Sequence, residues 1–344
     1  SAASDVYKRQ HFEIPALRSL FFVALDENEM SVKRMQSFVT VQPGETTSCV
    51  GCHEQRTRAP HPRGSSQIAA MSRPPSRIEP YADLPDVLDF PRDVQPILDR
   101  HCVECHDHDR SEGGINLSGD RTPYYSTAYW TMFSKSLVVD GRNKYGNRPP
   151  RSIGTSASPL MTCLDDSHQG VKVSDRERYT IRTWIDSGAT YSGTYACLGS
   201  GMFPVDFPDE IVVARCGGCH KATKESYRNV KKGAFYFQFG RQEPPQPLLM
   251  RIDDIILIRH LAYFQLGEAP LYQAMCNLDR PEHSIFLRSP LAKADGGLEI
   301  CGRPVFADRQ DKDYLAILAR IEAAAQRMRD QKRFDMPGFR PNRY

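Results

Sequence analysis

A pentapeptide of the form C-x-x-C-H occurs three times in the chain, as Cys49–His53 (motif 1), Cys102–His106 (motif 2) and Cys216–His220 (motif 3). C-x-x-C-H is the attachment pattern of c-type haem. Two thiols at this spacing can each form a thioether to the porphyrin, and the adjacent histidine can then bind the iron. We therefore predict three covalent haem c groups.

The cysteines predicted to form thioethers are Cys49, Cys52, Cys102, Cys105, Cys216 and Cys219. The histidines predicted to bind iron from the proximal side are His53, His106 and His220. Other uses of a C-x-x-C pair fit less well. A zinc ribbon needs a second pair of ligands at suitable spacing, which does not accompany each motif, and a redox dithiol does not require the trailing histidine. A structural metal or disulfide module would carry no covalent haem at all.

The ligand on the opposite face of each iron separates electron transfer, which two strong protein ligands favour, from catalysis, which an open site favours. For motif 2, His101 and His108 lie too close to the motif in sequence to reach that face. We expect His168, which precedes a predicted closing helix, to be the distal ligand. The alternative is that His168 is a histidine of a surface loop.

For motif 3 the expected distal ligand is His260, which lies in an apolar stretch, and the alternative is a hydrogen-bonded core histidine. Met275, His283 and Cys301 are further candidates. Near motif 1 the spare histidine is His11, too far along the chain to be assigned. The sixth position at motif 1 is therefore expected to be open or filled from outside this segment.

Four cysteines lie outside the motifs: Cys163, Cys197, Cys276 and Cys301. We expect disulfides, with Cys163–Cys197 and Cys276–Cys301 as plausible pairs, although sequence cannot fix the pairing. Covalent haem and disulfides both point to an extracytoplasmic location, the periplasm or an equivalent compartment. Residues 1–10 lack the apolar region of a signal peptide and look like a non-native leader, so we expect an N-terminally truncated chain whose signal peptide is missing.

The composition narrows the function classes. A net charge of +3 spread along 344 residues gives no case for nucleic acid or an anionic membrane as a partner. No apolar run approaches the ~18 residues that a membrane span needs. Twenty-five prolines and 23 glycines indicate a loop-rich protein with short elements. We expect redox proteins as partners, and other subunits of a larger complex as a further option.

The predicted fold class is α+β and loop-rich, with a β-rich N-terminal remnant followed by two mainly α cytochrome c-like domains. Residues 11–56 would form the remnant that carries motif 1, with strands over Leu17–Leu25 and Met35–Val41 joined by a polar turn. Residues 57–88 contain six prolines and read as a linker.

Residues 89–200 would form the cytochrome c-like domain of motif 2. Apolar residues over 94–98 share one helical face directly before the motif. A second helix over 174–188 would close the domain, because Ser174 and Glu177 form a capping box at its start. The apolar face of this helix comprises Ile181, Trp184 and Ile185.

Residues 201–333 repeat this plan weakly around motif 3 and would form the second cytochrome c-like domain. A terminal helix is expected from Asp311. Its apolar side comprises Tyr314, Ile317, Leu318, Ile321 and Met328. Residues 334–344 are expected to form an extended tail on the surface.

Two stretches resemble a known family. Val41–Ser48, which runs directly into motif 1, resembles the middle domain of the hydrazine synthase alpha subunit, a family with relatives across planctomycetes. Phe90–Asp107 and His168–Ala189 resemble the C-terminal cytochrome c domain of the same family. The resemblance covers most of residues 11–195. The region of motif 3 is similar to an extension found in relatives that need not make hydrazine.

The resemblance implies a bis-His haem at motif 2, formed by His106 and His168. In the middle domain of the family, a tyrosine four residues after the motif histidine binds the iron, and the histidine turns to a zinc ion. Here the tyrosine position is Thr57, a poor iron ligand. We therefore expect ordinary ligation by His53, and zinc near motif 1 is not supported.

The sequence thus predicts an exported multihaem c-type cytochrome that transfers single electrons. The alternative is a haem enzyme of the hydrazine synthase type. It would be an oxidoreductase acting on small nitrogen compounds or peroxide at a five-coordinate haem at motif 1. Binding of CO to the ferrous protein discriminates between the two.

Overall fold

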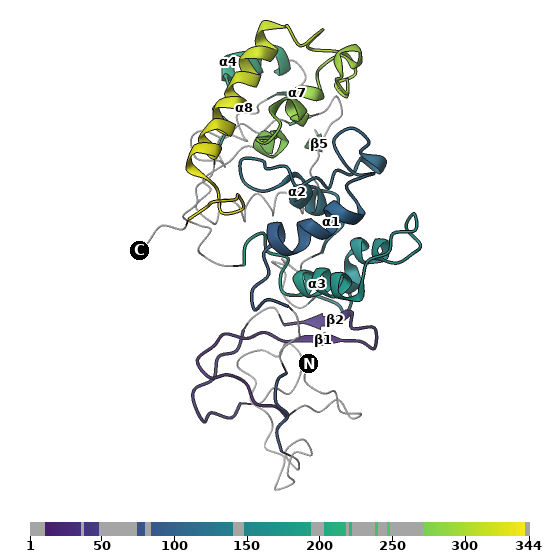
Figure 1. Cartoon of the computed structure of the whole chain (residues 1–344), viewed down its shortest axis with the longest axis vertical. Helices are drawn as coiled ribbons and strands as arrows, with labels where there is room; N and C mark the ends of the chain where they lie inside the picture. Colours follow the sequence, from purple (N-terminus) through teal and green to yellow (C-terminus); the bar gives the residue numbers. More distant parts are fainter. Residues whose placement is uncertain are drawn as a thin grey trace. The chain divides into compact units, whose positions relative to one another are not determined.

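The computed structural model describes residues 11–35, 38–47, 74–79, 84–139, 148–193, 203–217, 220–221, 238–239, 246–247 and 271–340. The chain divides into two compact units (Figure 1). Unit 1 comprises residues 1–87, 138–161 and 178–189, and unit 2 comprises residues 88–137, 162–177 and 190–344. Short helices combine with two small sheets, which confirms the predicted α+β class.

The predicted domain boundaries stay a prediction beside this division into units. The β-rich N-terminal part shares unit 1 with two segments from the predicted domain of motif 2. The regions of motif 2 and motif 3, predicted as two domains, share unit 2.

Unit 1 contains a β-hairpin. Strand β1 (Val23–Leu25) pairs antiparallel with β2 (Ser31–Arg34). Asp26 closes the turn between them, because its Oδ1 accepts hydrogen bonds from the backbone N–H groups of Asn28 and Met30, each at 2.9 Å. A carboxylate that caps its own turn in this way specifies a tight connection. The predicted hairpin and its polar turn are confirmed.

The second strand of the hairpin, β2, precedes the run Met35–Val41 where the prediction placed it. That run still pairs antiparallel with the first one, because Leu20 and Val39 exchange backbone hydrogen bonds and Met35 N–H donates to the carbonyl of Phe22. The residues of β2 are mostly polar and give no strand pattern. Ser31 is nevertheless fully buried. Its backbone N–H donates to Thr155 Oγ1 at 2.8 Å, so the buried donor has a partner.

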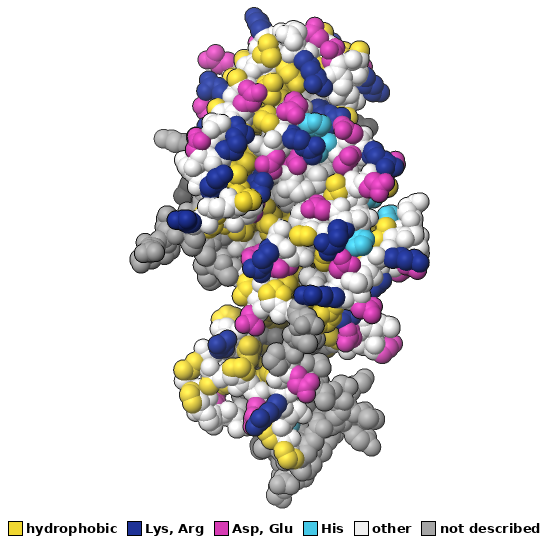
Figure 2. All heavy atoms as spheres, viewed as in Figure 1, with side chains coloured by type: hydrophobic (Ala, Val, Ile, Leu, Met, Phe, Trp, Pro, Cys, Tyr) yellow, Lys and Arg dark blue, Asp and Glu magenta, His cyan; other side chains and the backbone are white. Residues whose placement is uncertain are grey.

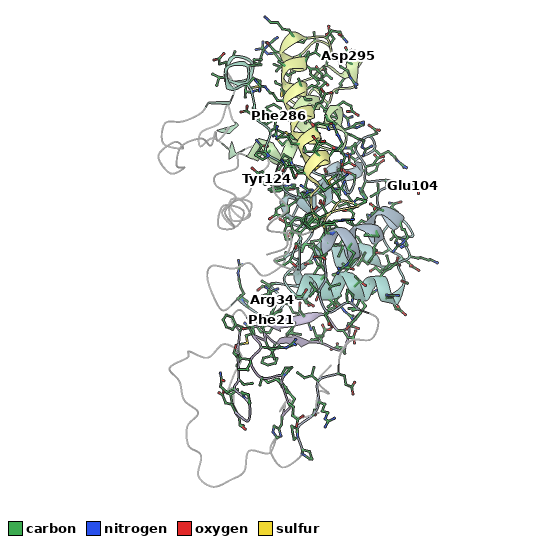
Figure 3. All side chains as sticks on the ribbon, turned by 60° about the vertical axis from the view of Figure 1, so that its left-hand side comes forward. Phe21, Arg34, Glu104, Tyr124, Phe286 and Asp295 are labelled. Carbon is green, nitrogen blue, oxygen red and sulfur yellow. The ribbon has the colours of Figure 1, made fainter. Side chains whose placement is uncertain are left out.

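A buried polar cluster supports β2. Thr155 donates from its N–H and its hydroxyl to the two carboxylate oxygens of Asp186, each at 2.9 Å. Burial raises the pKa of this carboxyl group. Gly154 has a φ of +73°, and a Cβ there would collide with Ser31 and Asp186, so glycine is required on both counts. On the outside of the hairpin, Arg34 lies over the ring of the exposed Phe21 (Figure 3).

Helix α3 (Asp175–Asp186) confirms the predicted closing helix. Ser174 N–H donates to Glu177 Oε2 at 2.8 Å, and Glu177 N–H donates back to Ser174 Oγ at 3.3 Å, which is the predicted capping box. Gly188 follows the helix with a φ of +116°. The predicted apolar residues are fully buried: Ile181, Trp184 and Ile185.

In unit 2 a short π-helical turn, η2 (Phe90–Val94), runs into helix α1 (Gln95–His101), which confirms the helix predicted directly before motif 2. Pro91 and Pro96 stand in the first turns, where no backbone donor is needed. Phe90 is fully buried and begins an aromatic cluster. The rings of this cluster that contact one another are Phe90, Tyr125, Tyr129, Trp130, Phe133 and Tyr191.

The other elements are short. The helical ones are η3 (Glu112–Gly114), α2 (Thr127–Ser134), η4 (Thr155–Ala157), η5 (Pro159–Leu164), α4 (Asp209–Cys216), η7 (Leu271–Met275), η8 (Pro281–His283), α7 (Ile285–Arg288) and η9 (Lys293–Asp295). The strands β3 (His220–Lys221), β4 (Gln238–Phe239) and β5 (Gln246–Pro247) form an antiparallel sheet in that order.

Helix α8 (Lys312–Gln331) is the longest helix of the described residues and confirms the predicted terminal helix. Asp311 caps it by accepting from the N–H groups of Asp313 and Tyr314. The predicted apolar side is buried except at Leu318, which is partly buried. It forms one hydrophobic cluster with residues of α4, of α7 and of the connecting segments: Phe203, Val205, Phe207, Val212, Leu278, Leu287, Leu291 and Phe306.

The start of the predicted tail is anchored by a buried ion pair. Arg333 is buried and donates to the carbonyl of Thr122 and to the carboxylate of Asp335. Asp335 also accepts from the hydroxyl of Tyr191 at 2.7 Å. This ion pair fixes the start of the tail, because a buried charge is retained only when its partners are in place.

The described helices contain none with both the length and the apolar character needed to span a bilayer. Charged side chains of both signs lie interspersed over the face of the molecule shown in Figure 2.

Candidate haem site at motif 2

Helix α1 places the first cysteine of motif 2. Cys102 follows its last residue, and its N–H donates to the carbonyl of Leu98 at 2.8 Å. The N–H groups of Cys105 and His106 both donate to the carbonyl of Cys102, at 3.2 and 3.0 Å. The motif is therefore a turn that continues the helix, with both cysteines half-buried. Two thiols on one turn are the arrangement that attachment to a porphyrin edge requires.

The ring of His106 is oriented by the loop that follows it. Nδ1 lies 3.1 Å from the carbonyl oxygen of Glu112. A carbonyl can only accept, so Nδ1 carries the proton and the lone pair is on Nε2. This is the tautomer that a histidine ligand needs, with its second nitrogen held by a backbone carbonyl. Gly113 and Gly114, with φ of +65° and +71°, allow the loop to turn back at this point.

His168 lies opposite His106. The centroids of the two rings are 6.1 Å apart, and the ring planes differ by 14°. A tight turn presents His168: its N–H reaches the carbonyl of Asp165 at 3.4 Å, and its own carbonyl accepts from Val171 N–H at 3.0 Å. Gly170, with a φ of +73°, completes this turn. The structure therefore brings together two histidines that are 62 positions apart in the chain.

These residues fit a haem c. With metal–imidazole bonds of about 2 Å, two imidazoles on opposite faces of one metal place their centroids roughly 6 Å apart. The observed separation of the His106 and His168 centroids agrees with that spacing, and the two ring planes are nearly parallel and stacked. The pKa of Cys102 is raised to about 11, mainly by burial and to a smaller extent by the neighbouring Cys163. This thiol therefore stays protonated at neutral pH.

A charged cluster fixes the start of α3 against the end of α1. Glu177 Oε1 accepts from Arg100 Nη2 at 2.7 Å and lies 3.1 Å from His101 Nε2. Burial opposes ionisation of Glu177, but hydrogen bonds from Ser174 and Arg100 outweigh it and lower the pKa to about 2. His101 is thus engaged beside the motif, in keeping with its exclusion as a distal ligand.

Motif 3 begins in the same way. Cys216 is the last residue of α4, and Gly217 N–H donates to the carbonyl of Val213 at 2.9 Å. Arg215 anchors the helix through ion pairs with Asp311 and Asp313, at 2.8 and 2.6 Å. The chain then becomes extended, since His220 starts β3.

Several predicted residues lie outside the described residues. These are the whole of motif 1, Thr57 at the tyrosine position of the family, Cys197, Cys219 and His260. Among the described residues, no group of three or more histidine, cysteine or acidic side chains could hold a metal ion. His11 is half-buried, and its carbonyl accepts from Ser76 N–H.

The other candidates for motif 3 have separate positions. Met275 packs against the hydrophobic cluster of α8. His283 lies edge-on to His108, with ring centroids 5.2 Å apart. Cys276 is buried whereas Cys301 is exposed, and the two are not joined to each other, so the expected Cys276–Cys301 disulfide is wrong. Their side chains occupy different environments, which sequence spacing does not reveal.

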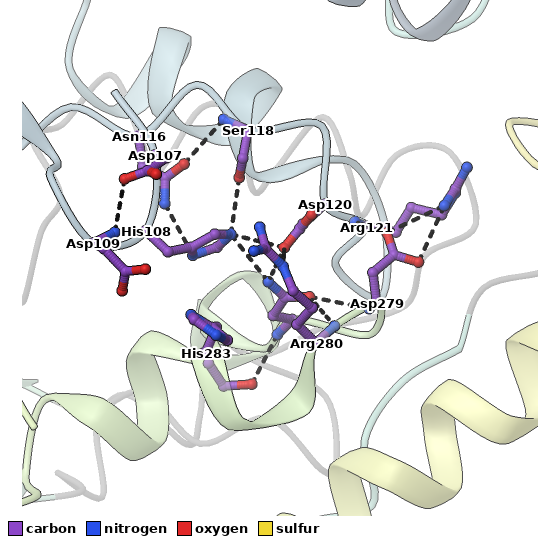
Figure 4. A network of polar contacts seen from close by, with 12 residues as sticks. Asp107, His108, Asp109, Asn116, Ser118, Asp120, Arg121, Asp279, Arg280 and His283 are labelled. Atoms are coloured by element: carbon purple, nitrogen blue, oxygen red, sulfur yellow. Dashed lines mark hydrogen bonds and ion pairs between the residues drawn. The ribbon is translucent and has the colours of Figure 1, made fainter. Parts of the chain in front are cut away.

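Sequence reasoning missed one feature of this site. His108, set aside as a distal ligand, is buried in a polar network with residues 277–288 (Figure 4). No local pattern marks this network, because its two halves lie more than 150 positions apart.

The paired histidines beside a C-x-x-C turn define a candidate site for covalent haem. Comparison with known proteins gives a related result. Residues 5–54 match the family model described as the hydrazine synthase alpha subunit middle domain. This range begins inside the segment that looked like a non-native leader, and it ends directly after motif 1.

Hydrazine synthase subunit alpha of Kuenenia stuttgartiensis is 32% identical over 129 residues, which cover 30% of this chain and 15% of the relative. The chain thus spans a small part of the length of that relative. No solved structure matches the chain. The chain is similar to the hydrazine synthase alpha subunit, as the residues ahead of motif 1 predicted.

Proposed function

We propose that this protein is an extracytoplasmic multihaem c-type cytochrome that transfers single electrons. The observation that carries the proposal is the pair of nearly parallel imidazoles, His106 and His168, 6.1 Å apart beside the thiols of motif 2. Two histidine ligands fill both axial positions and favour electron transfer over chemistry at the iron. Similarity to a hydrazine synthase alpha subunit supports haem as the group and a larger complex as its setting.

Each part of the site has a role in this proposal. Cys102 and Cys105 would form the thioethers, and the carbonyl of Glu112 would hold the His106 ring in its ligating tautomer. His168 would bind from the opposite face. When bound, haem c supplies an iron that cycles between the ferric and ferrous states, at a potential set by axial ligands and burial.

The remaining parts of the proposal rest on the repeated motif. Motifs 1 and 3 would carry haem through Cys49, Cys52, Cys216 and Cys219, with His53 and His220 as proximal ligands. His260 is proposed as the distal ligand at motif 3. The two regions predicted as cytochrome c-like would pass electrons to redox partner proteins.

The test is a pyridine haemochrome assay on the chain expressed with a c-type maturation system, together with a CO difference spectrum. The proposal predicts three haems per chain and no CO shift. Absence of covalent haem would refute it.

A second candidate function is catalysis at motif 1. The observation that favours it is the family match to the hydrazine synthase middle domain over residues 5–54, the range that contains motif 1. In this case the haem at motif 1 would be five-coordinate and would act on small nitrogen compounds or peroxide. Three haems with CO bound at one of them would support this candidate over electron transfer alone.

A further inference from the structure

His108 lies two residues after the proximal ligand of motif 2 and is almost fully buried, at 5% exposure. Its Nδ1 lies 3.1 Å from Asn116 Nδ2, and its Nε2 lies 2.8 Å from Asp120 Oδ2 (Figure 4). Asn116 Oδ1 accepts from Ser118 N–H at 3.0 Å, which fixes the amide so that its NH2 group donates to Nδ1. The proton of His108 is therefore on Nε2 and is donated to Asp120.

Asp120 is the centre of the network. In addition to His108, it accepts from Arg280 Nε at 2.7 Å and from Asn277 Nδ2. Asn277 Oδ1 accepts from the N–H groups of Asp279 and Arg280, which fixes the direction of this amide as well. Charge-assisted hydrogen bonds of this kind are about twice as strong as neutral ones.

The same downstream segment also holds the backbone at motif 2. Arg288 Nη1 donates to the carbonyl of His108 at 2.8 Å. Leu278 N–H donates to the carbonyl of Arg121 at 2.7 Å, and Arg121 N–H donates to Asp279 Oδ2 at 2.8 Å. Side chains and backbone from residues 277–288 thus hold both ends of the loop that starts at the proximal histidine.

This loop sets the position of His106. Leu117 N–H donates to the carbonyl of His106 at 2.7 Å. The carbonyl of Leu117 accepts in turn from Gln95 Nε2 of α1 at 2.9 Å. The loop carries Glu112, whose carbonyl orients the ring of His106. A shift of His108 or Asp120 would therefore be transmitted to the ligand through the loop.

We infer that residues Asn277–Arg288 are a structural part of the site at motif 2, and that Asp120 is the positioning residue through which they fix the proximal histidine. The inference rests on the proposed function in so far as His106 binds iron. It goes beyond it, because residues from the predicted domain of motif 3 then shape the site of motif 2. Groups that hydrogen-bond to metal-bound histidines, or hold the backbone around them, influence ligand orientation and metal properties in this way.

The experiment compares three variants of the full chain: Asp120→Asn, Asn277→Ala and the milder Arg280→Gln at the solvent-facing edge of the network. Asp206→Asn is the matched control, since this carboxylate is 84% exposed in its ion pair with Arg320. The first readout is hydrogen–deuterium exchange of peptides covering residues 104–118. The second is the set of EPR g-values and the reduction midpoint of the haem at motif 2.

Loss of a buried charge-assisted hydrogen bond is expected to raise exchange over residues 104–118 by roughly tenfold or more in Asp120→Asn and Asn277→Ala. Arg280→Gln should give a smaller change in the same direction. The g-values and midpoint should shift in the same order, and Asp206→Asn should leave both unchanged. If Asp120→Asn fails to fold, Arg280→Gln carries the test.

Unchanged exchange and unchanged g-values in all three network variants would overturn the inference, even with haem attached. A wild-type chain without haem at motif 2 would refute the proposed function instead. The exchange measurement would still show whether the segment holds the loop, so the two failures are distinguishable.

Discussion

Motifs 2 and 3 begin alike and then diverge. In each, a helix delivers the first cysteine, α1 to Cys102 and α4 to Cys216. After Cys102 the chain keeps turning and a loop folds back onto its histidine, whereas the histidine of motif 3, His220, lies in a strand and pairs with Phe239. Motif 2 has Val-Glu between its cysteines, and motif 3 has Gly-Gly, which favours helix much less.

The comparison separates features that neighbouring residues determine from features that need residues remote in the sequence. The helix before each motif is encoded locally, by apolar spacing and capping. The complete site at motif 2 needs three distant segments: the loop of Glu112, the turn of His168 and the segment 277–288. The motif therefore predicts the group locally, whereas the proposed coordination depends on segments as remote as His168 and residues 277–288.

The largest expected effect tests whether the two motifs are equivalent. Replacing Cys102 and Cys105 by serine should remove one haem per chain, because no thioether can then form at motif 2. The same double change at Cys216 and Cys219 should also remove one haem if motif 3 is loaded despite its extended histidine. A haem count by pyridine haemochrome measures both. A full count in the Cys102/Cys105 variant would contradict attachment at motif 2.

The next effect separates attachment from coordination. His168→Ala should keep the covalent haem at motif 2 but open its distal face, so that the ferrous protein acquires CO binding. Lys172→Ala, which removes a side chain that is 77% exposed four residues after His168, is the control and should not add CO binding. A CO difference spectrum records the result. An unchanged spectrum in His168→Ala would mean that another group occupies the distal position.

A stability measurement tests whether both motifs belong to one unit. Ile321 is fully buried on α8, so Ile321→Ala should lower the free energy of unfolding by about 2–5 kcal/mol. Leu315→Ala on the same helix, at 43% exposure, should cost much less. Denaturation followed by circular dichroism and by haem absorbance should shift together in Ile321→Ala. Separate transitions would show that the region of motif 2 folds independently of α8.

The smallest effect concerns the junction of α1 and α3. The pKa of Glu177 is lowered to about 2 in the folded chain from an ordinary value of 4.5. Its contribution to stability is therefore complete above pH 4.5 and is lost as the pH falls towards 2. Glu177→Gln should cost about 1 kcal/mol at pH 7, and its difference from wild type should shrink below pH 4.5. Denaturant titrations at pH 7 and pH 3 measure this. A difference that is equal at both values would contradict the ionised capping box.

The sequence predicted the elements whose signals are local. Helices α1, α3 and α8 start at capping residues or early prolines and bury the apolar faces expected of them. The position of β2 was not predicted, because Ser31 is buried against Thr155, more than 120 positions away. The anchoring of Asp335 was not predicted either, because its partner Tyr191 is equally remote. Long-range polar contacts leave no periodic pattern in a sequence.

The candidate site was likewise predictable only where local sequence patterns mark its residues. The pair His106 and His168 could be predicted, because motif 2 marks the first histidine and the second precedes the predicted closing helix. The family resemblance implied the same pair. The network of Asp120 could not be predicted, since its donors Asn277 and Arg280 lie in a region with no recognisable relation to motif 2.

The most direct test is the mass of the tryptic peptide that spans His101–Arg110 in the protein matured by a c-type system. We predict that this peptide carries one haem joined through both cysteines. The same peptide found with two unmodified thiols, or with a disulfide between Cys102 and Cys105, would contradict the assignment of motif 2 as a haem c site.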